Sequence, residues 1–436
     1  MRKYFGTDGI RRIANTELTP ELVYKVAKAG AYVLSKHTDH APTIFIGRDT
    51  RISGTLIESA MTAGFLSYGA NVKMLGVMPT PAVAYLTKKF KADASVVISA
   101  SHNTFEFNGV KYFSNKGMKI PDELEEEIEE VMDSGKINEL TAVNDKIGTS
   151  EIATELLDEY VYFFRKNFEE DLERLNRDDF VVAVDTANGA TSVVADKVFT
   201  VLGIKHHILN DSPNGININD GCGSTHLEML KQYVIDKKCS LGIAYDGDGD
   251  RCLAVDENGN EIDGDKIIAI ISQYLKSKGK LNKDTIVATV MSNLGLNKYA
   301  KQNELNFVQT KVGDRYVLEE MLKNGYNLGG EQSGHVICLD YNPTGDGILT
   351  SLMIIRAILE QGKKASEVAS IMKAYPQVLI NAKVSSDKKY DFDKDEEIKS
   401  AIEKLNKEFD GNGRVLIRAS GTEPLVRVMI EGEDQD

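Results

Sequence analysis

The sequence predicts an α/β protein in which three similar α/β domains with mixed sheets are followed by a smaller α+β domain at the C-terminus. Two observations support this prediction. Short apolar runs, typical of buried strands, alternate with amphipathic helical stretches over most of the 436 residues. A polar, glycine-containing loop also follows a strand in each of the first three units, and open α/β sheets bind ligands at such strand ends.

The first domain is assigned to residues 1–150. We expect its strands at 43–46, 72–75 and 94–99, and its helices at 54–68, 80–88 and 121–134. The strand at 94–99 leads directly into Ser101, His102 and Asn103. These polar side chains are therefore placed in a loop at the end of a buried strand.

The second domain is assigned to residues 151–252, the third to 253–370 and the last to 371–436. In the second we expect a helix at 154–168 and strands at 180–184 and 241–245. In the third we expect helices at 264–276, 294–302 and 316–323 and a strand at 285–289. In the last, strands at 378–384, 413–419 and 426–431 surround a helix at 396–409, which is an α+β pattern.

The composition is that of a soluble globular protein, with 42% hydrophobic and 27% charged residues. No apolar run approaches the length of a membrane span, and no signal-peptide core follows the first residues, so we expect a cytoplasmic protein without membrane insertion. The net charge of −14 argues against nucleic-acid binding. The cysteines lack CxxC spacing, which argues against zinc and favours reduced, buried thiols. They are Cys222, Cys239, Cys252 and Cys338.

The run at 246–251 is the most informative motif. Asp246, Asp248 and Asp250 alternate with glycines, and Arg251 follows. Side chains two residues apart on a strand are separated by ~7 Å, so the backbone must bend before three carboxylates can share one ion, and glycine permits that bend. Carboxylate oxygens suit Mg²⁺ or Ca²⁺. A solvated turn is the alternative, whereas an EF-hand is disfavoured because Arg251 stands where that loop requires glycine.

Ser101 allows three interpretations from the residues alone. It can simply end a strand, together with other small polar residues. It can belong to a hydrolase with the adjacent His102, although neighbours in sequence rarely orient as nucleophile and base, and the GxSxG pattern is missing. It can also carry a phosphoryl group, one oxygen of which would bind a metal held by the acidic loop, with Arg251 neutralising the remaining charge.

Two further loops have the composition of binding sites. In the first, Arg418 and Arg427 flank Ser420, Gly421 and Thr422, a pattern that can cradle an anion with exposed backbone N–H groups. A polar hairpin turn explains the same residues.

The second loop, 329–335, contains Glu331, Ser333 and His335 and suits recognition of sugar hydroxyls. A histidine in such a place is otherwise a satisfied structural residue.

Together these motifs resemble the α-D-phosphohexomutase superfamily, over the whole chain. The resemblance rests on residues 5–11, 99–103, 246–251, 330–335 and 418–424. Gln332 is typical of the phosphoglucosamine mutase branch, and residues 222–226 and 311–315 also look like that branch. The sequence departs from the usual pattern at Arg12, Thr104 and Phe107, where glycine, proline and an acidic residue are more common.

The resemblance implies four domains around a central cleft and interconversion of glucosamine 6-phosphate and glucosamine 1-phosphate. A glucosamine 1,6-bisphosphate intermediate would form, and the product would feed UDP-N-acetylglucosamine and cell-wall precursor synthesis. Ser101 would carry the phosphoryl group. One Mg²⁺ would bind to Ser101, Asp246, Asp248 and Asp250.

The remaining roles also follow from the resemblance. Arg11, Lys111 and Arg251 would line the reaction centre. Glu331, Ser333 and His335 would contact the sugar, and the non-reacting phosphate would bind in the loop that contains Arg418, Ser420, Gly421, Thr422 and Arg427.

Two alternatives accompany this hypothesis: a phosphomannomutase or phosphoglucomutase, and a non-catalytic protein that binds phosphosugars. The expected partner is a small phosphosugar, and a homodimer is left open.

Overall fold

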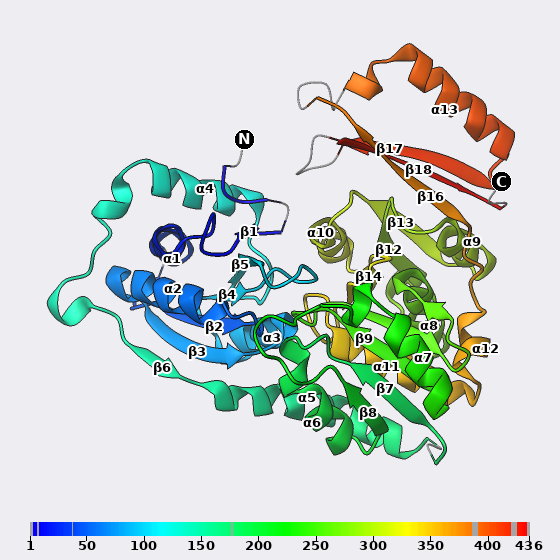
Figure 1. Cartoon of the computed structure of the whole chain (residues 1–436), viewed down its shortest axis with the longest axis horizontal. Helices are drawn as coiled ribbons and strands as arrows, with labels where there is room; N and C mark the ends of the chain where they lie inside the picture. The colour runs from blue at the N-terminus through cyan, green and yellow to red at the C-terminus, as the bar shows by residue number, and fades with distance from the viewer. Residues whose placement is uncertain are drawn as a thin grey trace.

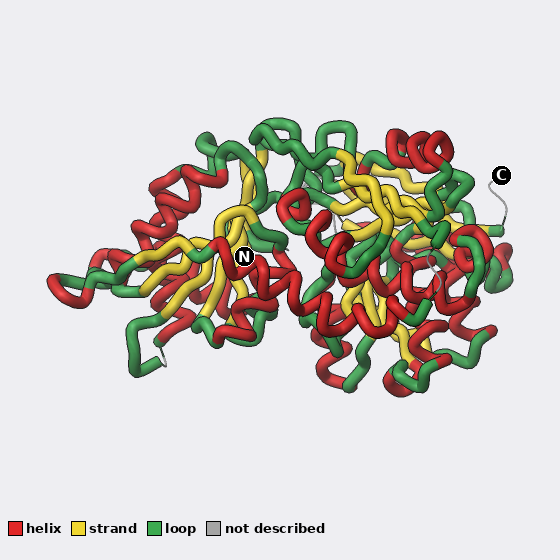
Figure 2. Tube along the Cα trace, turned by 90° about the horizontal axis from the view of Figure 1, so that it is seen from below, coloured by secondary structure: helices red, strands yellow, loops and turns green. Residues whose placement is uncertain are grey.

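The computed structural model of the chain describes residues 3–6, 8–36, 38–175, 178–385, 391–419 and 425–433, apart from the side chain of Asp393. Four β-sheets organise these residues. The first domain lies at one end of the long axis, and the C-terminal domain lies above the third domain at the other end (Figure 1). The view turned by 90° about this axis shows strands gathered in separate groups at the two ends (Figure 2).

The first domain contains a mixed six-stranded sheet with the order β1-β5-β4-β2-β3-β6. Its strands are β1 (Ile10–Ile13), β2 (Thr43–Arg48), β3 (Asn71–Val77), β4 (Ala94–Ile98), β5 (Phe107–Ser114) and β6 (Ser150–Ile152). Its helices are α1 (Pro20–Ser35), α2 (Gly54–Tyr68), α3 (Thr80–Phe90) and α4 (Asp122–Asp133). Because β5 runs antiparallel to both β4 and β1, these two strands point in the same direction. The loop that follows β4 therefore lies close to the side chains of β1, at one end of the strands.

The second domain has a five-stranded sheet with the order β11-β10-β9-β7-β8. Its strands are β7 (Val181–Asp185), β8 (Lys205–Leu209), β9 (Leu241–Tyr245), β10 (Cys252–Asp256) and β11 (Glu261–Ile262). Its helices are α5 (Leu157–Glu173), α6 (Ala195–Val201) and α7 (Glu228–Lys237). The strands β9 and β10 are antiparallel neighbours, so the acidic loop is the turn of a hairpin.

The third domain has a four-stranded sheet with the order β13-β12-β14-β15. Its strands are β12 (Thr285–Thr289), β13 (Asn306–Thr310), β14 (Leu328–Gly330) and β15 (Val336–Cys338). Its helices are α8 (Gly264–Ser277), α9 (Leu294–Gln302), α10 (Asp314–Asn324), α11 (Gly347–Gln361) and α12 (Ala365–Ala369). The loop that contains Glu331 joins β14 to β15, two short antiparallel strands.

The C-terminal domain has an antiparallel three-stranded sheet with the order β16-β18-β17. Its elements are β16 (Gln377–Lys383), α13 (Glu396–Phe409), β17 (Gly413–Ala419) and β18 (Leu425–Gly432). These observations confirm the predicted fold class of three mixed α/β domains and a smaller α+β domain.

The first three domains share one apolar core. Phe45 of the first domain, Ile243 of the second and Ile286 of the third belong to the same buried cluster. Helix α11 is apolar on nearly all sides and lies in this cluster, as a helix does when other elements surround it. The three sheets are therefore fixed relative to one another, and so are the loops at their edges.

Candidate active site

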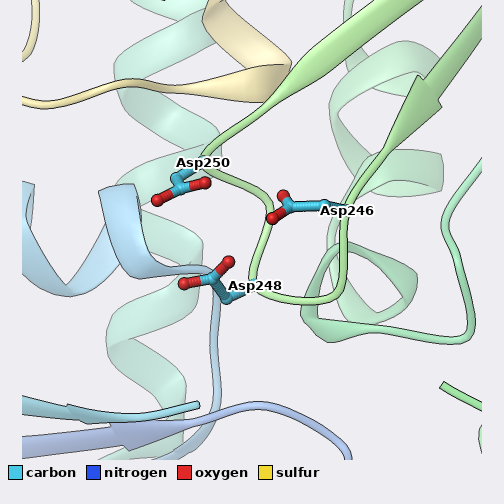
Figure 3. Close-up of side chains that lie close together, drawn as sticks. All are labelled: Asp246, Asp248 and Asp250. Carbon is cyan, nitrogen blue, oxygen red and sulfur yellow. The ribbon is translucent and has the colours of Figure 1, made fainter. Parts of the chain in front are cut away.

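The three aspartates of the acidic loop converge. Asp246, Asp248 and Asp250 are buried, and one carboxylate oxygen from each lies within 4.8 Å of the others (Figure 3). Gly249 has a φ of +72°, which a side chain would disfavour, and so permits the predicted bend.

This cluster fits a hard divalent cation. Among the described residues, the Oδ1 atoms of Asp248 and Asp250 are buried without a hydrogen-bond partner. Buried carboxylate oxygens without a partner are costly unless they bind a cation, and an all-oxygen donor set suits Mg²⁺. The residues present therefore match the metal that the sequence predicted.

Ser101 lies against the acidic loop. Its Oγ donates a hydrogen bond to Oδ2 of Asp246 at 2.7 Å, although the two residues belong to different domains. Gly247 makes this contact feasible, because a Cβ at that position would lie 2.6 Å from the carbonyl oxygen of Ser101. The nucleophile candidate and the metal candidate thus form a single site.

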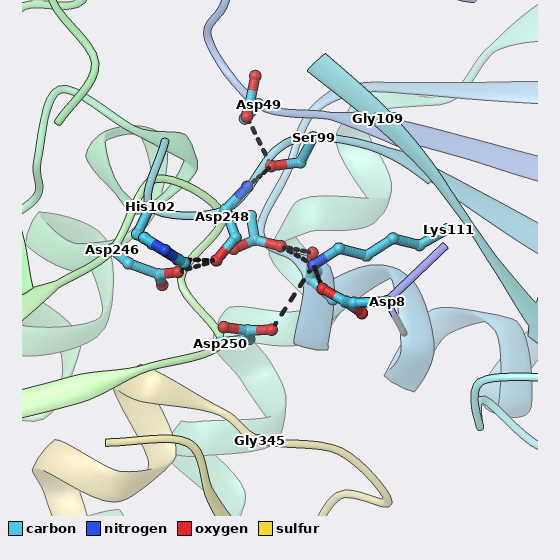
Figure 4. Close-up of polar contacts among 12 residues, drawn as sticks. Asp8, Asp49, Ser99, His102, Gly109, Lys111, Asp246, Asp248, Asp250 and Gly345 are labelled. Atoms are coloured by element: carbon cyan, nitrogen blue, oxygen red, sulfur yellow. Dashed lines mark hydrogen bonds and ion pairs between the residues drawn. The ribbon is translucent and has the colours of Figure 1, made fainter. Parts of the chain in front are cut away.

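Lys111 places a buried cation beside the aspartates. Its Nζ lies 2.9 Å from Oδ2 of Asp248, 3.3 Å from Oδ2 of Asp8 and 3.8 Å from Oδ2 of Asp250 (Figure 4). Burial alone would lower the pKa of Lys111, but the charges of Asp248 and Asp8 outweigh it and raise that pKa. Lys111 is therefore an ammonium ion at neutral pH.

Arg11 faces the same site from β1. Its Nη1 donates to Oδ1 of Asn103 and its Nη2 to Oδ2 of Asp8, both at 3.0 Å. The two basic side chains thus converge from the adjacent strands β1 and β5, and Arg11 contacts the loop that contains Ser101.

The electrostatic environment separates the pKa values of the aspartates. Burial, followed by the charges of Asp250 and Asp248, raises the pKa of Asp246 well above its usual range. Burial acts in the same direction on Asp250, but Lys111 and His335 outweigh it and lower the pKa of Asp250. A divalent cation at this position would favour the charged form of all three carboxyls.

His102 is neutral at physiological pH. Burial, together with the positive charges of Arg251 and Arg11, lowers its pKa to about 4. Its Nδ1 lies 3.4 Å from Oγ of Ser101, at the limit of a hydrogen bond. Such a low pKa makes His102 a weak base, which agrees with the sequence argument against a hydrolase.

Arg251 is held at the mouth of the acidic loop. Its backbone N–H donates to Oδ1 of Asp246 at 3.2 Å, and its buried Nε is without a hydrogen-bond partner among the described residues. Burial would lower its pKa, but the nearby charges of Asp246 and Asp250 raise it. A half-buried guanidinium whose buried Nε–H is unused is suited to bind an anion.

The side chains of the loop between β14 and β15 point in two directions, some toward the protein surface and one into the protein interior. Ser333 is exposed, and Glu331 is half-buried and accepts a hydrogen bond from the N–H of Gly313 at 3.1 Å. Burial and the charge of Asp314 raise the pKa of Glu331. His335 instead lies inside the protein: its Nε2 accepts from the N–H of Gly345 at 3.0 Å, and its Nδ1 is 3.5 Å from Oδ2 of Asp250.

The C-terminal sheet presents two arginines. Arg418 of β17 and Arg427 of β18 are directly opposite each other in the ladder. Burial and the charge of Arg427 lower the pKa of Arg418. Like charges on facing strands repel each other, and a bound anion would relieve that repulsion. Ser420, Gly421 and Thr422, the other predicted residues of this loop, lie outside the described residues.

The sequence did not predict some residues of the site, because these residues form contacts between domains. Lys119 bridges the first and third domains, with its Nζ 2.5 Å from Oδ1 of Asp8 and 2.6 Å from Oδ2 of Asp314. Thr80 joins the first domain to the second by donating through Oγ1 to Oδ2 of Asp248 at 2.7 Å. Asp8 and Asp314 do stand in glycine-containing motifs that the sequence analysis noted, but no local pattern predicts their partners.

None of the helices in the described part of the chain has the length and apolar character that a membrane span requires.

The fold and the site define a class of enzyme that known protein families also identify. The domains of the phosphoglucomutase/phosphomannomutase family match nearly the whole chain. Domain I matches at residues 2–139, domain II at 158–259, domain III at 263–375 and the C-terminal domain at 379–436. The chain therefore belongs to this family, within the α-D-phosphohexomutase superfamily.

Curated relatives narrow the assignment to one branch. The phosphoglucosamine mutase of Ruminiclostridium cellulolyticum is 53% identical over 436 residues, which cover all of this chain and 96% of the relative. That of Clostridium botulinum (strain Kyoto / Type A2) is 54% identical over 438 residues, with the same coverage. The chain thus belongs with the phosphoglucosamine mutases, which are isomerases, and the predicted resemblance is confirmed.

Solved structures share the fold at low identity. A phosphoglucomutase/phosphomannomutase family protein from Burkholderia thailandensis has a TM-score of 0.82 at 20% identity and covers 100% of this chain and 94% of its own. The N-acetylphosphoglucosamine mutase of Aspergillus fumigatus, solved in complex with GlcNAc-6P and magnesium, has a TM-score of 0.67 at 18% identity, with coverage of 100% and 93%.

Proposed function

We propose that this mutase interconverts glucosamine 6-phosphate and glucosamine 1-phosphate through a phosphoserine at Ser101. The observation that carries the proposal is the hydrogen bond of 2.7 Å from Oγ of Ser101 to Asp246, across two domains. It places the oxygen that would carry the phosphoryl group in a cluster of carboxylates that fits Mg²⁺. The 53% identity to phosphoglucosamine mutases supports the choice of substrate.

The proposed reaction consists of two phosphoryl transfers. In the first, the O–P bond at Ser101 breaks while the free sugar hydroxyl forms an O–P bond, and the proton of that hydroxyl ends on Oγ of Ser101; the product is glucosamine 1,6-bisphosphate. In the second, Oγ of Ser101 forms an O–P bond with the other phosphate of the intermediate, and the proton of Oγ ends on the released sugar oxygen. The enzyme returns to its phosphorylated form, and no group is consumed.

Asp246, Asp248, Asp250 and phosphorylated Ser101 would hold the metal. When bound, Mg²⁺ supplies positive charge to the phosphoryl oxygens during transfer. Lys111 is an ammonium ion beside the same aspartates, and Arg251 has a buried N–H available for an anion. These side chains stabilise negative charge at fixed positions, which is the main catalytic contribution expected in phosphoryl transfer.

The remaining predicted residues bind the parts of the sugar that do not react. Arg418 and Arg427, with the loop 420–424 between their strands, would hold the distal phosphate in both orientations of the intermediate. Glu331 and Ser333 would bind ring hydroxyls. His335 belongs to the same loop, but its contact with Asp250 supports a role in holding the acidic loop. The product would feed UDP-N-acetylglucosamine and cell-wall precursor synthesis.

The substitution Ser101→Ala tests the proposal. We expect interconversion to be lost while the melting temperature stays close to that of the wild type, because the substitution removes only the hydroxyl group with its contacts to Asp246 and His102. Intact-mass measurement and peptide mapping should find a phosphoryl group on Ser101 of the wild type and none on the variant. Turnover close to wild type in the variant, with no other phosphorylated residue, would refute the phosphoserine.

The substrate is tested separately from the mechanism. Values of kcat/KM for the phosphates of glucosamine, glucose and mannose should be highest for glucosamine. A clear preference for mannose 1-phosphate would keep the phosphoserine but assign the enzyme to the phosphomannomutases.

A further inference from the structure

Ser101 has a backbone conformation that its own side chain does not favour. Its φ is +52°, in the left-handed region that residues other than glycine rarely adopt. Such a conformation persists only when surrounding contacts hold it in place. The contacts of the Ser101 backbone therefore show which residues fix the position of its Oγ.

Arg51 binds the carbonyl oxygen of Ser101 and three further carbonyl oxygens close to it in the chain. Its guanidinium is fully buried, and its side chain is paired through Nε with Oδ2 of Asp49 at 2.8 Å. Its Nη2 donates to the carbonyl oxygens of Ser101 at 3.0 Å and Asn103 at 2.8 Å. Its Nη1 donates to the carbonyl oxygens of Thr104 and Phe107. All five N–H groups of the guanidinium are thus used, three of them on the loop that contains Ser101 and one on Phe107, the first residue of β5.

A second chain of hydrogen bonds, which also ends at Asp49, holds the backbone N–H of Ser101. It donates to Oγ of Ser99 at 2.9 Å, and the Ser99 hydroxyl in turn donates to Oδ2 of Asp49 at 2.6 Å. Asp49 therefore links the two routes, because it accepts from both Arg51 and Ser99 (Figure 4 shows the link between Asp49 and Ser99).

The second domain contributes Asn219. This residue is buried, and its Nδ2 donates to the carbonyl oxygens of Ser101 and Asn103, both at 2.9 Å. The carbonyl oxygen of Ser101 thus accepts hydrogen bonds from Arg51 and Asn219, which belong to two different domains. Of these two domains, the second also supplies the acidic loop, so Asn219 ties the position of Ser101 to that of its metal-binding partners.

We propose that Arg51 and Asn219 are positioning residues, which hold the Ser101 loop so that Oγ keeps one orientation toward the acidic loop while it gives up and regains a phosphoryl group. The inference rests on the proposed phosphoserine. The charge on Ser101 changes greatly between the two states, and a loop without these anchors would relax in one of them. The anchors bind only backbone carbonyls at 104 and 107, so they do not depend on the unusual Thr104 and Phe107 side chains.

The decisive variants are Asn219→Ala and Arg51→Lys, the second of which keeps the charge but loses the planar fork. Misplacing a reacting group by about 1 Å can lower a rate by ~100-fold, so we expect kcat to fall by ~10- to 100-fold in both variants. KM should change by less than ~3-fold, because neither residue belongs to the proposed sugar site. Rates are divided by the fraction of molecules phosphorylated on Ser101, as measured by intact mass.

Two matched controls come from the same segments. Arg48→Lys alters a nearby arginine at the end of β2, whose Nε pairs with Glu58 at 3.1 Å instead of binding the Ser101 loop. Asn217→Ala alters a residue near Asn219 whose side chain bonds within its own loop, to Ser212 and Asn214. Both controls should keep the wild-type kcat.

A purely structural role predicts a different result. If Asn219→Ala lowers only the melting temperature, while the rate per phosphorylated molecule equals that of the controls, the proposal is overturned. Should Arg51→Lys fail to fold, Asn219→Ala decides alone. Ser101→Ala distinguishes failure of the proposed phosphoserine from failure of the positioning role. Activity in Ser101→Ala would refute the phosphoserine. If Ser101→Ala is inactive but Asn219→Ala has the wild-type rate, only the positioning role is refuted.

Discussion

The first three domains and the C-terminal domain are attached in different ways. The first three are joined through one apolar core that contains residues from every sheet of the trio. The C-terminal sheet instead meets the third domain through polar contacts. Arg414 pairs with the buried Glu431 at 2.7 Å and also donates to the carbonyl oxygens of Val290 and Ser292. Glu431 accepts a hydrogen bond from the N–H of Leu294 at the start of α9.

This difference predicts separate roles for the two regions, phosphoryl transfer in the first and binding of the distal phosphate in the second. The groups that would transfer phosphate lie where packing is tight on all sides, so their positions vary little. The two arginines that would hold the distal phosphate lie on a sheet joined by a smaller, polar contact, and such contacts permit domains to move relative to each other. Changes in the first region should therefore affect kcat, and changes in the second should affect binding.

Among the substitutions that compare the two regions, the largest effect is expected from Asp248→Asn in the tightly packed region. It removes one of three carboxylates from the metal cluster and weakens the ion pair with Lys111. Loss of one such electrostatic group typically lowers kcat by ~100- to 1,000-fold. Steady-state kinetics with a Mg²⁺ titration should show this decrease and a weaker response to the metal. The control Asp236→Asn changes the same charge on α7, outside the site, and should behave as wild type; a wild-type kcat in Asp248→Asn would contradict the metal assignment.

A smaller effect of a different kind is expected from Arg418→Met in the C-terminal sheet. A hydrogen bond to a charged group contributes about 1.5–3 kcal/mol, so KM for the phosphosugar should rise by ~10- to 100-fold while kcat changes less. The melting temperature should not fall, because the substitution removes repulsion from Arg427. Lys404→Met on α13 is the control with the same change of charge. A loss of kcat at unchanged KM would contradict the proposal that the C-terminal sheet contributes to binding and not to phosphoryl transfer.

The smallest effect on turnover is expected at the junction between the regions, where the prediction concerns stability. Asp265, in the first turn of α8, is buried, accepts the N–H of Asn293 at 2.6 Å and leaves Oδ1 without a hydrogen-bond partner among the described residues. Burial, and then the charge of Asp263, raises its pKa to about 8. Because the unfolded pKa is ~3.9, unfolding releases a proton, and the wild type loses stability as the pH rises from ~4 to ~8.

Asp265→Asn mimics the protonated carboxyl and should remove this loss. Its melting temperature should match that of the wild type near pH 4 and exceed it increasingly up to pH 8. Thermal denaturation across this range measures the difference, and the exposed Asp284→Asn should follow the wild type at every pH. A constant offset between Asp265→Asn and wild type would show that the carboxyl is charged in the folded protein.

Local patterns predicted the parts of the fold that are locally determined. Buried strands such as β9 and β12 are continuous apolar runs, and glycine-containing loops follow them. By contrast, the pattern does not indicate β1, with two arginines among four residues, or β5, which is interrupted by asparagine and glycine. These strands form because they pair with each other and with β4, which is a tertiary effect.

The site shows the same limit. The residue types in the 246–251 motif indicated a metal cluster, with a solvated turn as the alternative. The burial and convergence of the three carboxylates favour the metal cluster. The contact between Ser101 and Asp246 came from chemical reasoning and from resemblance, because nothing local links residues 145 positions apart. Arg51 and Asn219 were not predicted as positioning residues, since the groups that they would hold on the Ser101 loop are backbone carbonyls, which every residue has.

The position of α11 has a consequence for how the protein is made. The helix begins at Gly347, whose N–H donates to the carbonyl oxygen of Gly249 at 2.9 Å, so the back of the acidic hairpin is closed by a much later part of the chain. A ribosome adds about 5–20 residues per second, so the hairpin emerges roughly 5–20 seconds before the helix that supports it. During that interval the apolar faces destined for α11 remain uncovered. We therefore expect the second domain to complete the packing of its acidic loop only after the third domain has been made.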